Sequence, residues 1–167
     1  TAATAQVVAE ALGLSLPHSA LAPSGTEIWK DMGRRSALAM LDLEKNGLTT
    51  ADILSEKSLE NALALHCAFG GSTNLIMHLP AIAHQAGLRR PNVDDWRRFN
   101  AEIPRLVDAL PNGPQHFATV QVFLAGGVPE VMLHLRDMGK LHLDAMTVTG
   151  QTVGENLDWW ENSERRI

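Results

Sequence analysis

The segment Gly70–Asn74 has the residue types and spacing that most strongly indicate chemistry in this sequence. It reads Gly-Gly-Ser-Thr-Asn and leads directly into an apolar helical pattern. Two glycines allow another group to approach the backbone closely, or they allow a positive φ. Because Ser, Thr and Asn begin helices, we expect several backbone N–H groups to point outward at the positive end of the helix dipole. Such a helix end binds carboxylate or phosphate, so one interpretation of the segment is an anion-binding site. The alternative interpretation is a tight, well-capped connection between two helices.

The histidines near this segment raise the question of a metal site. His66 precedes it, and His78 and His84 follow it. A transition metal needs three or four ligands that converge on one point. His78 and His84 are six residues apart, on different faces of one helix, and no His-Glu-x-x-His motif is present. We therefore expect no metal site here. His78 itself lies on an apolar stripe, where it either makes a hydrogen bond in the core or faces a ligand.

A small hydrolase with Ser72 or Cys67 as its nucleophile is a further alternative. The segment lacks the Gly-x-Ser-x-Gly elbow of hydrolases and the Gly-Lys-Ser/Thr of phosphate loops. A cysteine nucleophile also needs a base and an oxyanion site nearby, and no base can be assigned from the sequence. Cys67 lies between His66 and Ala68 near a helix end, and we interpret it as a small buried residue.

Composition limits the class of protein. The 167 residues are enough for one domain, and 45% hydrophobic with 20% charged residues is typical of a globular protein. A net charge of −5 and a pI near 5.7 argue against nucleic acid and against an anionic membrane surface as partners. No apolar run is long enough to span a bilayer, and no signal peptide opens the sequence. The single cysteine excludes an internal disulfide and fits a reducing cytoplasm.

The periodicity predicts a helix-rich α/β fold. One predicted helix has Trp29, Met32, Ser36, Met40 and Leu43 near one face and ends at Gly47. Pro80 must kink another helix or mark its later start. Helices are expected over residues 1–12, 26–46, 50–54, 59–66, 75–86, 93–102, 116–125, 129–137 and 152–160. Short strands are expected over residues 103–108 and 145–149. The expected architecture is a three-layer arrangement in which helices cover a short, mostly parallel sheet.

Four ordered blocks resemble the dihydroxy-acid/6-phosphogluconate dehydratase family. The first is Ala68–Asn74 with His78-Leu79 and Ala81-Ile82-Ala83 after it, which is similar to the family's internal Gly-Gly-Ser-Thr-Asn block. The other three blocks are Thr1–Pro17, Ala125–Pro129, and Met146–Thr152 with Glu155-Asn156-Leu157. The form His78-Leu79-Pro80 and the tail Trp159–Arg166 are most similar to the aldonate branch, the D-xylonate dehydratases.

The resemblance implies a reaction and cofactors. Family members eliminate water between C2 and C3 of a 2,3-dihydroxy acid to give a 2-keto-3-deoxy acid. It implies an Fe–S cluster whose iron acts on the C3 hydroxyl, a Mg²⁺ that binds the substrate carboxylate, and a serine alkoxide as the base. Their protein ligands and the serine belong to parts of the family's sequence outside this segment, so no catalytic residue is expected here. The expected substrate-binding residues are Gly70, Gly71, Ser72, Thr73, Asn74 and His78.

The expected organisation is one partial domain, residues 1–167, from the middle of the family's N-terminal domain. The absence of an initiator Met and the abrupt ends favour a piece of a longer chain, with a cysteine encoded within about ten residues before Thr1. The piece itself is expected to be inactive. The intact protein is expected to be a cytoplasmic homo-oligomer, a dimer or tetramer, of carbohydrate metabolism that acts on a small sugar acid. The alternative is a noncatalytic helical interaction module.

Overall fold

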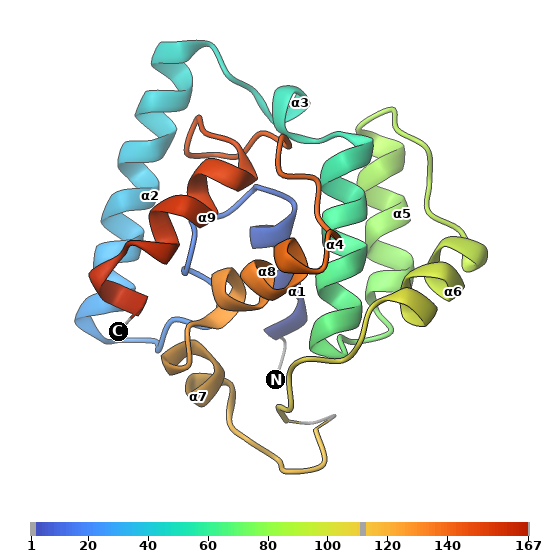
Figure 1. The fold of residues 1–167 in the computed structure, drawn as a ribbon. Helices are drawn as coiled ribbons and strands as arrows, with labels where there is room; N and C mark the ends of the chain where they lie inside the picture. Colours follow the sequence, from blue (N-terminus) through green and yellow to red (C-terminus); the bar gives the residue numbers. More distant parts are fainter. Residues whose placement is uncertain (1–2, 111–112, 167) are drawn as a thin grey trace.

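The computed structural model describes residues 3–110 and 113–166, and their regular structure is helical (Figure 1). Helix α4 is buried along most of its length, and α1 packs against both α4 and α8. Helix α9 packs on α8, and α6 packs on α4. In chain order the helices are α1 (Ala3–Ala11), α2 (Glu27–Asn46), α3 (Thr50–Ile53), α4 (Glu56–Phe69), α5 (Leu75–Gln85), α6 (Val93–Glu102), α7 (Thr119–Leu124), α8 (Gly127–Asp137), α9 (Val153–Glu161) and the 3₁₀ helix η1 (Glu164–Arg166).

The predicted α/β sheet is wrong, because residues 3–110 and 113–166 contain no strand. The segment expected as an edge strand, 103–108, has no regular structure, and the N–H groups of Leu106 and Val107 both donate to the carbonyl of Ala68. The segment 145–149 folds back on itself and forms a single bridge between Met146 and Thr152. A strand needs a neighbouring strand to pair its backbone groups. Here a helix end and a turn pair those groups instead.

Most helix boundaries agree with the sequence because capping is local. Thr26 accepts a hydrogen bond from the Trp29 N–H at the start of α2, and Gly47 ends that helix in the left-handed conformation. Ser55 and Thr152 cap α4 and α9 in the same way. Pro80 lies inside α5 rather than at a later start. The helix expected over 116–125 is shorter than predicted, covering only α7. No helix among the described residues is long and apolar enough to cross a membrane.

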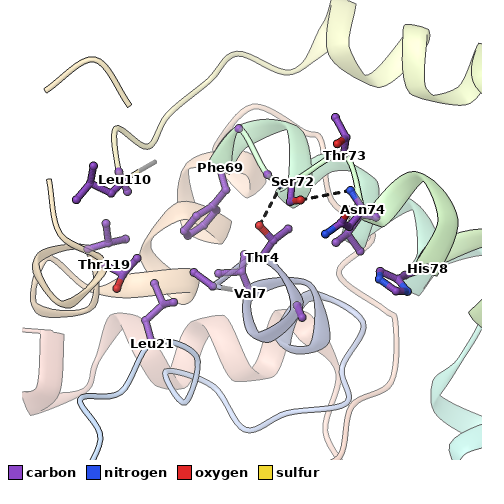
Figure 2. Close-up of a pocket in the computed structure, with 17 residues that line it drawn as sticks. Thr4, Val7, Leu21, Phe69, Ser72, Thr73, Asn74, His78, Leu110 and Thr119 are labelled. Carbon is purple, nitrogen blue, oxygen red and sulfur yellow. Dashed lines mark hydrogen bonds between the residues drawn. The ribbon is translucent and has the colours of Figure 1, made fainter. Parts of the chain in front are cut away.

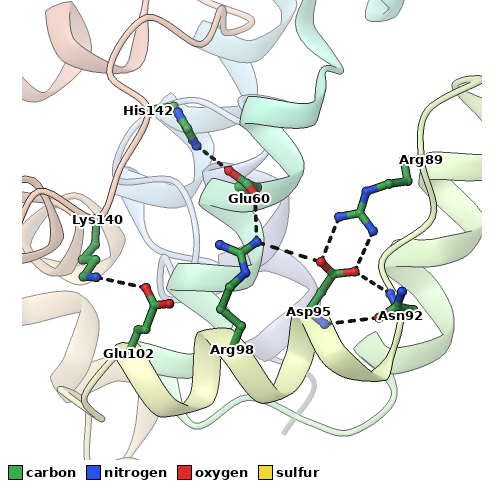
Figure 3. A network of polar contacts seen from close by, with 8 residues as sticks. All are labelled: Glu60, Arg89, Asn92, Asp95, Arg98, Glu102, Lys140 and His142. Carbon is green, nitrogen blue, oxygen red and sulfur yellow. Dashed lines mark hydrogen bonds and ion pairs between the residues drawn. The ribbon is translucent and has the colours of Figure 1, made fainter.

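A network of ion pairs fastens α6 and the segment 140–142 to α4 (Figure 3). Arg98 of α6 donates to Glu60 of α4 at 2.9 Å, and Glu60 lies 2.7 Å from the His142 ring. Arg89 donates to both carboxylate oxygens of Asp95 at 2.8 Å each. The Arg89 guanidinium lowers the pKa of Asp95 to about 2, against the opposing effect of partial burial. Of these groups, Asp95 is therefore the one whose ionised state the fold favours most strongly.

Replacing Asp95 with Asn should lower the free energy of unfolding by about 1 kcal/mol at neutral pH, since the exposed Arg89 is screened by solvent. The folded pKa is depressed. The contribution is therefore present above the ordinary value of 3.8 and disappears as pH falls towards 2. Chemical denaturation of both proteins at pH 7 and at pH 2 measures it. A stability difference that is the same at both pH values would contradict the ion-pair explanation.

Candidate functional site

A pocket of about 610 Å³ opens between the start of α1, the α4–α5 connection, residues 109–110 and helix α7 (Figure 2). All six residues predicted to bind substrate line it. The structure thus brings the Gly70–Asn74 loop together with His78, which lies on the first turns of α5. The remaining lining residues come from elsewhere in the chain: Ala3, Thr4, Ala5, Val7, Leu21, Phe69, Leu75, Ala109, Leu110, Thr119 and Val122.

The two positions of the loop, Gly70 and Gly71, require glycine for different structural reasons. Gly70 ends α4 in the left-handed conformation, with φ of +61°, and its N–H donates to the Cys67 carbonyl at 3.0 Å. Gly71 has no positive φ, but its backbone passes close to two side chains. A Cβ at Gly71 would lie 2.5 Å from Cδ2 of His66 and 2.8 Å from Cγ2 of Thr4. Gly70 is therefore required by conformation and Gly71 by space.

Ser72 is held from two sides. Its N–H donates to Oγ1 of Thr4 on α1 at 3.1 Å, and its carbonyl lies 3.0 Å from Nε2 of His66 on α4. The His66 ring is buried edge-on to Trp96 at 4.9 Å between centroids. Burial lowers the pKa of His66, against the raising effect of the hydrogen bond to Ser72. A neutral ring with its proton on Nε2 therefore donates to the Ser72 carbonyl.

The expectation of several outward N–H groups at this helix start is wrong. The N–H groups of Leu75, Ile76 and Met77 donate to the carbonyls three residues earlier, and the Asn74 N–H lies 3.3 Å from Oγ of Ser72. Asn74 forms no side-chain cap. Over residues 71–74, only the N–H of Thr73 lacks a hydrogen-bond acceptor among the described residues. The loop therefore offers side chains, rather than a nest of amides, to a ligand.

Polar side chains collect at one end of the pocket. Thr73, Asn74 and His78 are all exposed, and Figure 2 shows them on the side away from Leu110 and Thr119. The reading of His78 as a buried core residue is wrong, since α5 buries Leu75, Leu79 and Ala83 instead. His78 is exposed and lines the pocket, which is where a side chain that faces a ligand would lie.

The opposite wall is formed by residues without a recognisable motif in the sequence. Leu21 lines the pocket with φ of +68°, and its N–H donates to Oε1 of Gln6 at 3.0 Å. One turn further along α1, the buried Glu10 accepts the N–H groups of His18 at 2.7 Å and Ala20 at 2.9 Å. Two polar side chains of α1 thus hold the loop that carries this wall. The only sign of this arrangement in the sequence was that Gln6 and Glu10 are four residues apart on one predicted helix and therefore lie on the same face.

The described residues do not fit a metal or an Fe–S cluster. They contain no group of three or more His, Cys, Asp or Glu side chains that could hold a metal ion. Cys67 is buried, and burial raises the pKa of its thiol to about 11. A thiol is a nucleophile or a cluster ligand only as the thiolate. The prediction that Cys67 is a small buried residue is confirmed. Its neighbour His66 directs Nε2 to the Ser72 carbonyl rather than to the thiol.

Comparison with known proteins gives matches over nearly the whole chain. Residues 1–156 match the model of the dihydroxy-acid/6-phosphogluconate dehydratase N-terminal family. Two relatives from Escherichia coli K12, D-xylonate dehydratase YagF and D-xylonate dehydratase YjhG, are 67% and 64% identical over 166 residues, 99% of this chain. The dihydroxy-acid dehydratase of Mycobacterium ulcerans is 46% identical over 159 residues, 95% of this chain. The chain spans 25% of the length of each Escherichia coli relative and 28% of the Mycobacterium protein.

The resemblance recognised in the sequence is confirmed by these matches, which cover nearly the whole chain. The chain belongs to the dihydroxy-acid/6-phosphogluconate dehydratase family, and it corresponds to a portion of that family's N-terminal region.

Proposed function

We propose that this chain is part of the N-terminal domain of a sugar-acid dehydratase that removes water from an aldonate such as D-xylonate. The product would be a 2-keto-3-deoxy acid. The observation that carries the proposal is 67% identity with a D-xylonate dehydratase over 99% of the chain. The exposed polar end of the pocket supports it, because a linear polyhydroxy acid needs several hydrogen-bonding groups close together.

The Gly70–Asn74 loop and His78 have two roles in this proposal. The side chains of Thr73, Asn74 and His78 bind hydroxyl or carboxylate oxygens of the sugar acid. Ser72 does not contact the substrate through its backbone, because Thr4 and His66 already occupy its N–H and carbonyl. It fixes the loop, so that the neighbouring side chains are held in place before the substrate arrives. None of these residues is assigned a catalytic role.

The proposal includes an Fe–S cluster and Mg²⁺ in the intact enzyme, which would supply Lewis-acid chemistry for loss of a hydroxide. Because the described residues do not fit either group, their ligands would belong to parts of the protein outside this segment. The relatives leave room for them, since this chain spans only a quarter of the length of YagF. A cytoplasmic location belongs to the same proposal.

The direct test uses the complete protein that contains this segment. Incubated with D-xylonate, it should form a 2-keto-3-deoxy acid, detected by the chromophore that such acids form with semicarbazide. The 167-residue chain alone should form none. A complete protein that dehydrates no aldonate, with its metal content verified, would overturn the proposal and favour the noncatalytic interaction module.

Replacing His78 or Asn74 with Ala in the complete enzyme should raise KM about tenfold for each residue, the effect of losing one ligand hydrogen bond. The matched control is His84→Ala, because His84 is exposed on the same helix but does not line the pocket. Steady-state kinetics with D-xylonate measures both. Equal effects of the His78 and His84 replacements would show that the pocket end does not bind the substrate.

A further inference from the structure

Helix α7 forms part of one wall of the pocket, and a single buried side chain anchors it. Thr119 and Val122 of α7 line the pocket. Phe123 is the buried residue of this six-residue helix, whereas Leu124 beside it is 73% exposed. A short helix with few buried contacts opens easily unless something holds it. The position of Thr119 and Val122 in the wall therefore depends on what holds Phe123.

The side chain that holds Phe123 is His18, from the loop after α1. The two rings are stacked, with 4.2 Å between their centroids and 3° between their planes. Nε2 of His18 also lies 3.1 Å from the carbonyl oxygen of Phe123. One contact thus fixes the phenyl ring and the other fixes the backbone at the last turn of α7. Together they hold the helix, and not only its side chain, against the loop.

The His18 ring is itself held from several sides. The ring of the fully buried Trp160 lies 4.4 Å away between centroids, and its Nε1 donates to Glu130 at 3.1 Å. A Cβ added at Gly127 would lie 3.1 Å from Cδ2 of His18, so the start of α8 closes another side. The His18 N–H donates to Glu10 at 2.7 Å. A ring confined in this way is a rigid support for α7.

The His18 ring is a neutral donor. Burial lowers the pKa of His18, the hydrogen bond to the Phe123 carbonyl opposes the shift, and Arg165 lowers the pKa further. Nδ1 has no hydrogen-bond partner among the described residues. A proton on Nδ1 would therefore be a buried N–H group without an acceptor, which is costly. The single proton belongs on Nε2, where it reaches the Phe123 carbonyl.

The backbone at His18 shows that the ring is retained at a cost. Its φ is +59°, in the left-handed region that glycine adopts more readily than other residues. Glycine would relieve the backbone here but would remove the ring. Local strain of this kind persists where the side chain performs a role that offsets it.

We propose that His18 is a positioning residue for the substrate pocket, which holds α7 through Phe123 so that Thr119 and Val122 stay in the wall. Leu21, three residues after His18, lines the same pocket, so His18 lies between the two segments that form this wall. His18 itself does not line the pocket and acts through Phe123. The inference rests on the proposed function, because it takes the pocket as the substrate site. Its effect is therefore expected on substrate binding rather than on bond breaking.

His18→Gly removes the ring and suits the backbone conformation. In the complete protein, amide hydrogen exchange in α7 should become at least about tenfold faster, while exchange in the buried α4 stays unchanged. The matched control is His116→Gly, because His116 precedes the same helix and also has a positive φ, +57°, but is exposed. It should leave α7 as in the wild type. Equal exchange of α7 in His18→Gly and wild type would overturn the proposal.

Steady-state kinetics separates positioning from general stability. His18→Gly should raise KM for D-xylonate about tenfold and change kcat by less than about twofold, whereas His116→Gly should change neither. Faster exchange in α7 with an unchanged KM would show that His18 supports only the fold, and would overturn the proposal. A wild-type protein that dehydrates no aldonate would overturn the proposed function and this inference with it. An active wild type with unchanged His18→Gly kinetics would overturn the inference alone.

Added imidazole tests the hydrogen bond. His18→Gly leaves a space beside Phe123 and Trp160 with the shape of one imidazole ring, and buried apolar spaces bind small rings. Imidazole has an N–H to donate to the Phe123 carbonyl, whereas 1-methylimidazole has none. Imidazole should therefore lower the KM of His18→Gly towards the wild-type value, and 1-methylimidazole should not. The same additions to the wild type correct for effects on the metals. Equal effects of the two compounds on His18→Gly would contradict the role of the Nε2 hydrogen bond.

Discussion

Stability of the chain is expected to decrease as pH rises from about 4.5 to about 8, and Glu10→Gln should abolish this dependence. Glu10 is a buried carboxyl on α1, and its two oxygens accept the N–H groups of His18 and Ala20. Burial raises the pKa of Glu10 from 4.5 to about 8, although the backbone hydrogen bonds from Ala20, His18 and Ser19 oppose the shift. The folded protein therefore keeps this carboxyl protonated over a pH range in which the unfolded chain loses the proton.

The sign follows from the raised pKa. The stabilising contribution is complete below the unfolded value of 4.5 and is lost as pH rises through the folded value of about 8. The total loss is about 5 kcal/mol, because the pKa rises from 4.5 to about 8 and one pKa unit corresponds to about 1.4 kcal/mol. Glutamine cannot titrate, so the variant lacks this slope. It can accept only one of the two N–H groups, which costs it about 1–3 kcal/mol. The variant should be less stable at pH 5, and the difference should shrink or reverse at pH 8.5.

Urea denaturation of both proteins between pH 5 and pH 8.5 measures the effect. The difference between the two curves isolates Glu10, because other titrating groups are common to both. Gln6→Ala is the matched control, one turn earlier on α1 with a hydrogen bond to the same loop at Leu21. It should lower stability slightly and equally at every pH. Parallel curves for wild type and Glu10→Gln would show that Glu10 is ionised in the folded protein.

Gly71→Ala is expected to lower the free energy of unfolding by about 2 kcal/mol and to disrupt the pocket. The added Cβ would lie 2.5 Å from His66 Cδ2 and 2.8 Å from Thr4 Cγ2, distances at which atoms must move. The His66 ring cannot move freely, since it is buried against Trp96. The loop must therefore shift, and the bonds that Ser72 makes to His66 and Thr4 weaken.

Thermal denaturation gives the change in stability, and kinetics of the complete enzyme gives the change in kcat/KM, expected to fall at least about tenfold. Gly33→Ala adds the same methyl group where no heavy atom lies within 4 Å, and in dilute solution it should stabilise α2 slightly. If Gly71→Ala were as stable and as active as the parent, the close approach of the loop to α1 and α4 would have no functional consequence.

Much of the helical structure could be predicted because its determinants are close in sequence. Thr26 and Gly47 bound α2, and the helix expected over 93–102 has these bounds in the structure, where Asn92 caps it. The Gly70–Asn74 loop was likewise recognisable as a contiguous block. Such signals depend on backbone groups within four residues of one another, so neighbouring residues are sufficient to read them.

The predicted sheet failed for the opposite reason. A β-prone segment becomes a strand only when another strand pairs with it, and the sequence of 145–149 does not state its partner. In the structure the Val148 N–H donates to the Gly13 carbonyl and the Thr147 N–H donates to Gln151, which leaves no ladder to form. The exposure of His78 was also undecidable from periodicity, since an apolar stripe does not show which part of it a neighbouring helix covers.

The sequence by itself determined the position of most helices, the glycine that ends α2, the family and the loop Gly70–Asn74. Only the tertiary structure decided that this loop, Thr4 and Leu21 line one pocket and that Glu10 is buried. It also decided that several large apolar side chains of α2 remain exposed. The physical reason is the range of the forces involved. Capping and helix propensity act within a few residues, whereas burial of a carboxyl and the shape of a pocket depend on segments that meet only after the chain has folded.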